Sequence, residues 1–199
     1  KTDEKKFREE NNLNEKPIIA LLPGSRKQEI SKMLSIMLSV VDDFKDYQFV
    51  IAGAPSQDFH FYEKFLGNKN VKYISNKTYD LLSVATAALV TSGTATLETA
   101  LFKVPEVVCY KGNWISYQIA KRIITLKYIS LVNLIMDKEV VKELIQDELN
   151  KKNLSNELSK LLNPETRAVI LKNYDVLENK LGGVGASEKT AKFIINDIC

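Results

Sequence analysis

The stretch "PIIALLPGSRKQEISKML", residues 17–34, joins an apolar run to a turn and then to a helical pattern. The run at 17–23 is short and bounded by prolines, which predicts a buried strand. Gly24, Ser25 and Arg26 follow it and predict a turn. After the turn, apolar residues recur with the spacing of one helical face: Ile30, Met33, Leu34, Met37, Leu38 and Val41.

The same unit repeats along the first half of the chain. Helices are predicted between the strands at 57–66, 78–85 and 94–103. Thr78 is expected to cap the second of these helices. Further strands are predicted at 47–54, 71–75, 87–93 and 104–110. Strands that alternate with helices at this spacing indicate an α/β fold, with a parallel sheet flanked by helices.

Helical patterns dominate the second half, which predicts a helical C-terminal extension from about residue 139. Amphipathic helices are predicted at 115–124, 139–150, 153–162 and 163–181, and Ser187 is expected to cap a last helix after the break at 182–187. We expect residues 1–199 to form a single domain, of which residues 1–16 are a polar lead-in.

Composition limits the function classes. The net charge of +3 is too small to indicate a nucleic-acid partner, and 45% hydrophobic residues are ordinary for a soluble globular protein. No apolar run is long enough to span a bilayer, and the opening "KTDEKKFREE" does not resemble a signal peptide. Cys109, Cys199 and His60 give neither a disulfide framework nor a metal-ligand spacing. We therefore expect a cytoplasmic protein without a metal or cofactor.

The turn at Gly24, Ser25 and Arg26 is a candidate anion site. A glycine lets backbone N–H groups approach an anion, the helix that follows adds its positive dipole end, and a guanidinium suits phosphate oxygens. Alternatively, Ser25 and Gln28 form a capping box and Arg26 is only solvated. The turn lacks both the Walker ending and the glycine triplet of a dinucleotide fingerprint.

A second candidate is "TSGTATLETA", residues 91–100. Ser92, Gly93 and Thr94 again place small and hydroxyl groups at a predicted helix N-terminus. Glu98 lies four residues past Thr94, so one helical turn brings both to the same face, where a carboxylate accepts hydrogen bonds from a ribose diol. Alternatively, Glu98 is a surface partner of the helix dipole. Because ligands of a parallel sheet bind at the carboxyl ends of its strands, the two turns together suggest a nucleoside diphosphate.

Several segments resemble one family, in order along nearly the whole chain: "ALLPGSRKQEI", "SGTATLETAL", "YKGNWISYQIAKRIITLKYISLVNLI", "VKELIQDE" and "GGVGASEKTAKFI". They are similar to the C-terminal, donor-binding half of lipid-A-disaccharide synthase. The resemblance implies a UDP-sugar-binding domain, the Rossmann-like half of a GT-B glycosyltransferase. It also implies inverting, metal-independent transfer of 2,3-diacylglucosamine from its UDP conjugate to 2,3-diacylglucosamine 1-phosphate, giving lipid A disaccharide phosphate and UDP.

The resemblance also assigns roles to single residues. It implies that both turns bind the pyrophosphate and that Glu98 binds the ribose. It also implies that Asn133 and Gln146 lie near the donor sugar. No catalytic base is assigned, because the family's base is expected in the missing N-terminal half. Two positions depart from the family: Val132 replaces a proline before Asn133, and Glu106 replaces an apolar residue at a strand start, with little functional weight.

The resemblance further implies the partners: the UDP-sugar donor, the lipid monosaccharide phosphate acceptor and the N-terminal half. A peripheral position on the inner face of the inner membrane is a further option, since aromatic and basic residues alternate at 111–128 and suit a membrane interface. A core-facing helix with a solvated basic side is the preferred explanation of that pattern, and both can hold together. A homodimer through the C-terminal helices stays open. So do two other classes: a sugar-nucleotide epimerase and a non-catalytic nucleotide-binding module.

Overall fold

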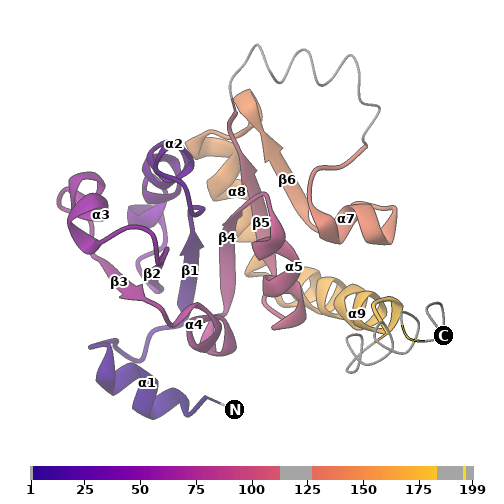
Figure 1. Cartoon of the computed structure of the whole chain (residues 1–199), viewed down its shortest axis with the longest axis horizontal. Helices are drawn as coiled ribbons and strands as arrows, with labels where there is room; N and C mark the ends of the chain where they lie inside the picture. Colours follow the sequence, from indigo (N-terminus) through magenta and orange to yellow (C-terminus); the bar gives the residue numbers. More distant parts are fainter. Residues whose placement is uncertain (1, 113–126, 183–194, 196–199) are drawn as a thin grey trace.

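The computed structural model describes residues 2–112, 127–182 and 195, and its centre is one parallel sheet (Figure 1). The strand order is β3-β2-β1-β4-β5-β6, and all neighbouring strands run parallel. The strands are β1 (Ile18–Leu22), β2 (Gln48–Gly53), β3 (Val71–Ser75), β4 (Ala87–Thr91), β5 (Glu106–Tyr110) and β6 (Lys142–Ile145). The predicted parallel α/β fold is confirmed.

Helices cover both faces of the sheet, because its central strands are apolar on both sides. In β1, Ile19 and Leu21 join the apolar cluster of one face, and Ile18 and Ala20 join that of the other. The first cluster takes its helical residues mainly from α2, α3, α8 and α9, and the second from α1 and α4. The helices are α1 (Glu4–Glu10), α2 (Lys27–Leu38), α3 (Phe59–Leu66), α4 (Thr78–Val84), α5 (Thr94–Leu101), α7 (Leu131–Met136), α8 (Lys151–Leu161) and α9 (Pro164–Lys180).

The strand order reverses between β1 and β4. The chain proceeds from β1 to β2 and β3 on one side, and then returns to build β4, β5 and β6 on the other. In the register, Leu22 of β1 lies opposite Val90 of β4, so the turns after these strands begin at nearly the same level. Loops that leave such a reversal in opposite directions open a crevice at the carboxyl edge of the sheet.

The predicted helix at 139–150 is wrong. Residues Lys142–Ile145 form β6, which pairs with β5, and Gln146–Glu148 form a 3-10 turn. Apolar residues at 140, 141, 144, 145 and 149 fit a helical face, but pairing along the open edge of β5 decides the structure. The helical extension therefore begins at Lys151 instead of residue 139, and α7 precedes β6.

The predicted helix caps have mixed outcomes. Asn163 caps α9 as predicted, since its Oδ1 accepts hydrogen bonds from the N–H groups of Glu165 and Thr166. Thr78 is not a cap: Lys77 holds the N-cap position of α4, and Thr78 is its first residue. The predicted helix at 115–124 and the predicted cap at Ser187 lie outside the described residues.

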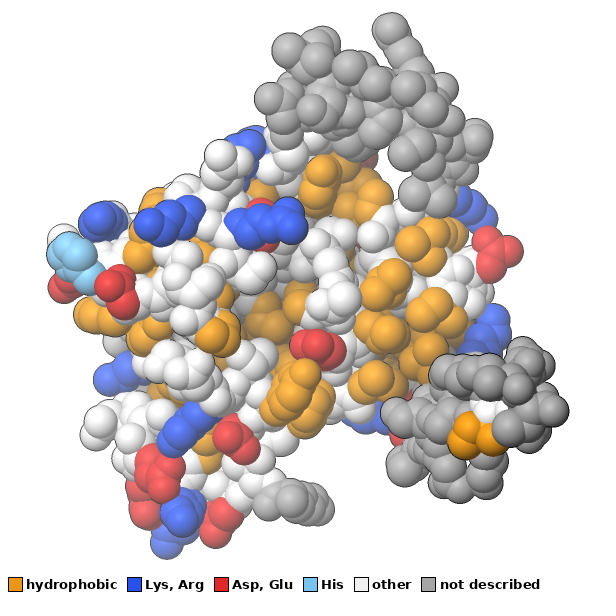
Figure 2. Space-filling view, in the orientation of Figure 1, with side chains coloured by type: hydrophobic (Ala, Val, Ile, Leu, Met, Phe, Trp, Pro, Cys, Tyr) orange, Lys and Arg blue, Asp and Glu red, His pale blue; other side chains and the backbone are white. Residues whose placement is uncertain are grey.

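Hydrophobic side chains gather over α5, α7 and α9 on the face that Figure 2 shows. Leu101 of α5, Leu134 of α7 and Val176 of α9 are exposed. The predicted homodimer and the predicted contact with another half of the enzyme require apolar surface of this kind, and both stay predictions. Among the described helices, none combines the length and the hydropathy that a transmembrane span requires.

Candidate functional site

A cavity of about 330 Å³ lies at the carboxyl edge of the sheet, where the strand order reverses. Its walls come from the ends of three strands and from the first residue of α4: Leu22, Gly24, Ser25, Arg26 and Glu29 after β1, Ala52, Gly53, Ala54 and Pro55 after β2, Thr91, Ser92, Gly93, Thr94 and Ala95 after β4, and Thr78. The structure thus brings both predicted turns to one cavity.

The turn after β1 is closed by Glu29 in the first turn of α2. Its Oε2 accepts hydrogen bonds from the N–H groups of Ser25 and Arg26, each at 3.3 Å. Its Oε1 lies 3.7 Å from Arg26 Nη1. The capping partner is therefore Glu29 and not the predicted Gln28, because Arg26 rather than Ser25 is the N-cap of α2 and Glu29 is the third residue of the helix. The side chain of Arg26 itself is 84% exposed beside the cavity.

Gly24 is required here for two reasons. Its φ of +106° lies in a region that residues with a side chain rarely adopt. In addition, a Cβ at this position would lie only 2.9 Å from Glu29 Oε2 and 3.0 Å from Glu29 Cβ. The space that the missing side chain leaves is thus taken up by Glu29.

The turn after β4 presents donors from its backbone. Ser92 has both of its donors in use: its N–H donates to Cys109 O at 3.0 Å and its hydroxyl to Ile129 O at 3.1 Å. Thr94 and Ala95 are the first residues of α5, so their N–H groups have no acceptor within the helix. These N–H groups and the positive end of the α5 dipole make this wall suited to an anion.

Thr91 is a lining residue that the sequence did not single out. It is the last residue of β4, it is 8% exposed, and its Oγ1 has no hydrogen-bond partner among the described residues. A buried hydroxyl without a partner costs free energy, so a polar ligand in this cavity would relieve that cost.

Glu98 does not line the cavity. It lies on α5 four residues past Thr94, which is about 6 Å along a helix. Its carboxylate lies close enough to Tyr79 of α4 to raise the pKa of that phenol. Thr78, the residue before Tyr79, lines the cavity, but Tyr79 and Glu98 do not.

Asn133 lies on α7 and is fully buried. Its Nδ2 donates to Val141 O at 2.8 Å and to Glu143 Oε1 at 2.9 Å. Its Oδ1 accepts from the N–H groups of Val140 at 2.7 Å and Val141 at 3.0 Å. The amide therefore has all four of its hydrogen bonds and ties α7 to β6.

Gln146 follows β6 directly and so lies at the carboxyl edge, but it does not line the cavity. Its φ of +54° places it in the left-handed region. Its Nε2 is buried without a partner among the described residues. Of the nine predicted site residues, the structure thus gathers six around the cavity and leaves Glu98, Asn133 and Gln146 outside its lining.

Charge at the cavity is simple. Of its lining residues, only Arg26 and Glu29 carry a formal charge. Within the described ranges, no group of three or more His, Cys, Asp or Glu residues could hold a metal ion. Fixed N–H groups, two helix N-termini and one guanidinium can bind an anion and stabilise negative charge that develops on it.

Solved structures define the class of fold. The chain matches a UDP co-structure of S. aureus MnaA with a TM-score of 0.63 at 17% identity, covering 98% of this chain and 50% of that one. It matches the glycosyltransferase SnogD from Streptomyces nogalater with a TM-score of 0.57 at 18% identity, covering 92% of this chain and 43% of that one. The fold is that of a Rossmann-like half of a GT-B glycosyltransferase.

Sequence comparison gives the family. The model of the lipid-A-disaccharide synthetase family matches residues 1–194, and the chain belongs to this family. The lipid-A-disaccharide synthase of Syntrophus aciditrophicus is 37% identical over 181 residues, which are 87% of this chain and 47% of that protein. That of Persephonella marina is 31% identical over 192 residues, 90% of this chain and 50% of that protein. The chain thus spans about half the length of the curated relatives that it matches.

Proposed function

We propose that this chain is the donor-binding half of a lipid-A-disaccharide synthase. The donor is UDP-2,3-diacylglucosamine, and the acceptor is 2,3-diacylglucosamine 1-phosphate. The transfer inverts the anomeric centre and gives lipid A disaccharide phosphate and UDP. One observation carries the proposal: the two turns of the family's motifs converge on one cavity at the reversal of strand order.

In this proposal, the pyrophosphate of the donor bridges the two turns. The N–H groups of Thr94 and Ala95 bind one phosphate, and Arg26 binds the other through its guanidinium. Ser92 supports the turn through its bonds to Cys109 and Ile129, while Gly93 lets the ligand approach the backbone. As UDP departs, negative charge grows on these oxygens, and the fixed donors stabilise it without a metal.

The residues outside the lining take supporting roles in the same proposal. The ribose extends from the phosphates along α5 and offers its diol to Glu98, about 6 Å from Thr94. Gln146 offers its buried amide, whose Nε2 has no partner in the described part of the chain, toward the donor sugar. Asn133 acts by positioning, because its own amide is fully used in holding α7 on β6.

The acceptor site and the catalytic base are assigned to the half of the enzyme that this chain does not match. A hydroxyl nucleophile requires a base within hydrogen-bonding reach, and the cavity offers only Glu29, which is already engaged at the turn. The acylated substrates would place the complete enzyme on the inner face of the inner membrane. This chain alone is expected to bind UDP weakly and to transfer no sugar.

Calorimetric titration with UDP, ADP and GDP tests the proposal. UDP should bind at least tenfold more tightly than the other two nucleotides. The Glu98→Ala variant should lose roughly tenfold in UDP affinity, the value of one or two hydrogen bonds to a charged group. Glu165→Ala serves as the matched control, since it removes an exposed carboxylate from the first turn of α9.

Equal affinity for the three nucleotides would support the non-catalytic module instead. Sugar transfer by the chain alone would contradict the assignment of the base to the other half. The epimerase alternative predicts interconversion of a UDP-sugar by this chain, which the same samples test by NMR.

A further inference from the structure

We propose that the carboxylate of Glu29 is the chain's own occupant of the phosphate site, and that a nucleoside diphosphate displaces it on binding. The inference rests on the proposed function and deepens it, because it names the residue that competes with the ligand for the phosphate site. Glu29 is a competitor of the ligand in this account and not a catalytic residue.

The geometry of the occupied site is that of a bound anion. Glu29 Oε2 accepts from two successive N–H groups, those of Ser25 and Arg26, at the N-terminus of α2. This is the arrangement in which helix N-termini bind phosphate oxygens. The Arg26 guanidinium lies 3.7 Å from the second carboxylate oxygen, as it would from a second ligand oxygen. The free chain thus fills the site with its own negative charge.

The hold on this carboxylate is weak. Both of its hydrogen bonds are 3.3 Å long, beyond the usual range for a charged acceptor. Its side chain is 38% exposed and that of Arg26 is 84% exposed, so both remain in contact with water. An exposed ion pair of this kind contributes little free energy, and displacing the carboxylate into solvent therefore costs little.

A second observation in the same cavity points to a ligand. The Oγ1 of Thr91 is buried and has no partner among the described residues. The Thr91 Cγ2 also lies 3.6 Å from the position of a Cβ on Gly24, which places Thr91 between the two turns.

Displacement favours a ligand that reaches both turns. A diphosphate can bind the free N–H groups of Thr94 and Ala95 with one phosphate while the other replaces Glu29. A monophosphate satisfies only one turn, and it gains nothing from displacing a carboxylate that is already hydrogen-bonded there. Glu29 therefore lowers the affinity for a diphosphate, which has to displace it, and has less effect on a monophosphate that binds only at Thr94 and Ala95.

The test is titration of the 199-residue chain and its Glu29→Gln variant with UDP, UMP and uridine. A glutamine oxygen still accepts the two hydrogen bonds but carries no charge, so the competing anion is removed and the cap is kept. We expect UDP to bind the variant about 3- to 10-fold more tightly than the unmodified chain, and UMP to gain less than UDP. Uridine affinity should not change, because uridine has no phosphate.

Glu15→Gln is the matched control. It removes one negative charge from an exposed residue ahead of β1, at the opposite edge of the sheet, and it should leave UDP affinity unchanged. Glu29→Ala adds a second readout, because it opens both N–H groups and removes the cap. Its melting temperature should fall while its UDP affinity rises; a purely structural cap would lower both.

Two outcomes overturn the inference. If UDP binds the unmodified chain and Glu29→Gln binds it equally or less tightly, Glu29 is no competitor, and the proposed function stands without it. If the unmodified chain and both variants fail to bind UDP at all, the proposed function fails, and the inference fails with it.

Discussion

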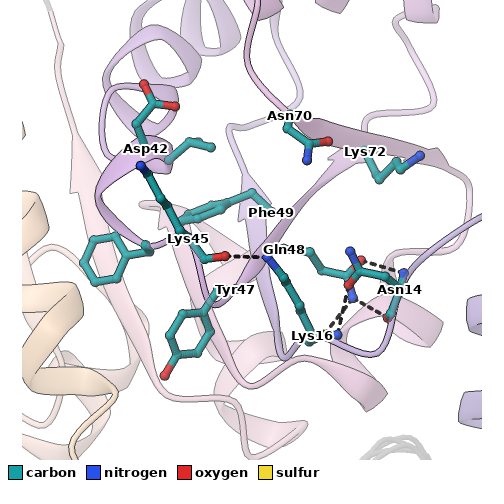
Figure 3. Close-up of a pocket in the computed structure, with 11 residues that line it drawn as sticks. Asn14, Lys16, Asp42, Lys45, Tyr47, Gln48, Phe49, Asn70 and Lys72 are labelled. Carbon is teal, nitrogen blue, oxygen red and sulfur yellow. Dashed lines mark hydrogen bonds between the residues drawn. The ribbon is translucent and has the colours of Figure 1, made fainter.

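Each edge of the sheet has a cavity, and the two cavities differ in whether their polar groups are already hydrogen-bonded within the protein. The cavity at the carboxyl edge has about 330 Å³, and the one at the amino edge, which Figure 3 shows, has about 230 Å³. Lysines, amides and aromatic rings line the second: Asn14, Lys16, Asp42, Phe44, Lys45, Tyr47, Gln48, Phe49, Asn70 and Lys72 are among its residues. By side-chain charge alone, the amino edge is the more attractive anion site.

Hydrogen bonding reverses that order. At the amino edge, Gln48 donates to the carbonyl oxygens of Asn14 and Lys16, both at 2.7 Å, and accepts from the N–H of Asn14 (Figure 3). Lys16 Nζ donates to Lys45 O at 2.6 Å. These bonds fasten the lead-in segment to β2. At the carboxyl edge, by contrast, the first N–H groups of α5 have no acceptor within their helix, and the Thr91 hydroxyl has no partner among the described residues.

The fold itself produces this difference. In a parallel sheet, each helix begins after the carboxyl end of one strand and returns to the amino end of the next. Helix N-termini with free N–H groups therefore collect at one edge of the sheet. Donors without hydrogen-bond partners, rather than cavity size or formal charge, distinguish the candidate binding site from the amino-edge cavity, whose polar groups bond to the protein itself. Substitutions at four positions test this distinction.

The largest effect is expected at Gly24. Gly24→Ala places a Cβ 2.9 Å from Glu29 Oε2 and blocks the space that a phosphate would enter. We expect UDP affinity to fall about 10- to 100-fold, and stability to fall by about 1–2 kcal/mol because φ is +106°. Gly67→Ala is the matched control: φ is +53° there, and nothing lies within 4 Å of its Cβ. It should lose similar stability and keep its UDP affinity.

Gln48→Ala probes the other edge. Removing this buried side chain leaves the N–H of Asn14 without its acceptor and the carbonyl oxygens of Asn14 and Lys16 with Arg8 as their remaining donor. This should cost about 1–3 kcal/mol of unfolding free energy in a urea titration. UDP affinity should remain within twofold. A tenfold loss of UDP affinity without a change in stability would assign ligand binding to the amino edge.

Glu106 tests whether an unpartnered polar group always signals a site. Its carboxyl is fully buried at the start of β5, has no partner among the described residues, and burial raises its pKa well above the usual value. The folded state therefore binds more protons than the unfolded state once the pH exceeds the unfolded pKa, and stability should fall as pH rises from 5 to 8.

Glu106→Gln should remove this dependence, so its stability gain over the unmodified chain should be larger at pH 8 than at pH 5. Glu106→Val should be about 1–3 kcal/mol more stable at pH 8, since it buries no polar group. UDP affinity should not change in either variant. A Glu106→Gln variant that keeps the original pH dependence would show that another group titrates.

The smallest effect is expected at Lys72. Its charge lines the amino-edge cavity, but its side chain is exposed and makes no ion pair within the described residues. Lys72→Ala should change stability by less than about 0.5 kcal/mol and leave UDP affinity unchanged. A clear loss of UDP binding in this variant would break the comparison.

The sequence predicted the cavity better than it predicted the contacts inside it. Alternating strands and helices already place Gly24 and Gly93 at one edge, because every strand of a parallel sheet ends there. The spacing of Ser25 and Gln28 predicted a capping box one residue too early, because the N-cap of α2 is Arg26 and its partner is Glu29. Thr91 gave no pattern, because any residue can end a strand.

The region around Asn133 escaped prediction for a different reason. Its four hydrogen bonds depend on β6, whose apolar spacing imitates a helix. Only the unpaired edge of β5 makes this segment a strand, and that information comes from residues more than thirty positions away. Sequence pattern alone therefore misplaced the element that fixes Asn133.

Amide NMR of the ¹⁵N-labelled chain during titration with UDP tests the central claim most directly. The account predicts that the amide signals of Ser25, Arg26, Thr94 and Ala95 shift in a saturable way, while those of Asn14, Gln48 and Lys72 stay in place. Saturable shifts at the amino edge, with the four carboxyl-edge amides unmoved, would contradict it.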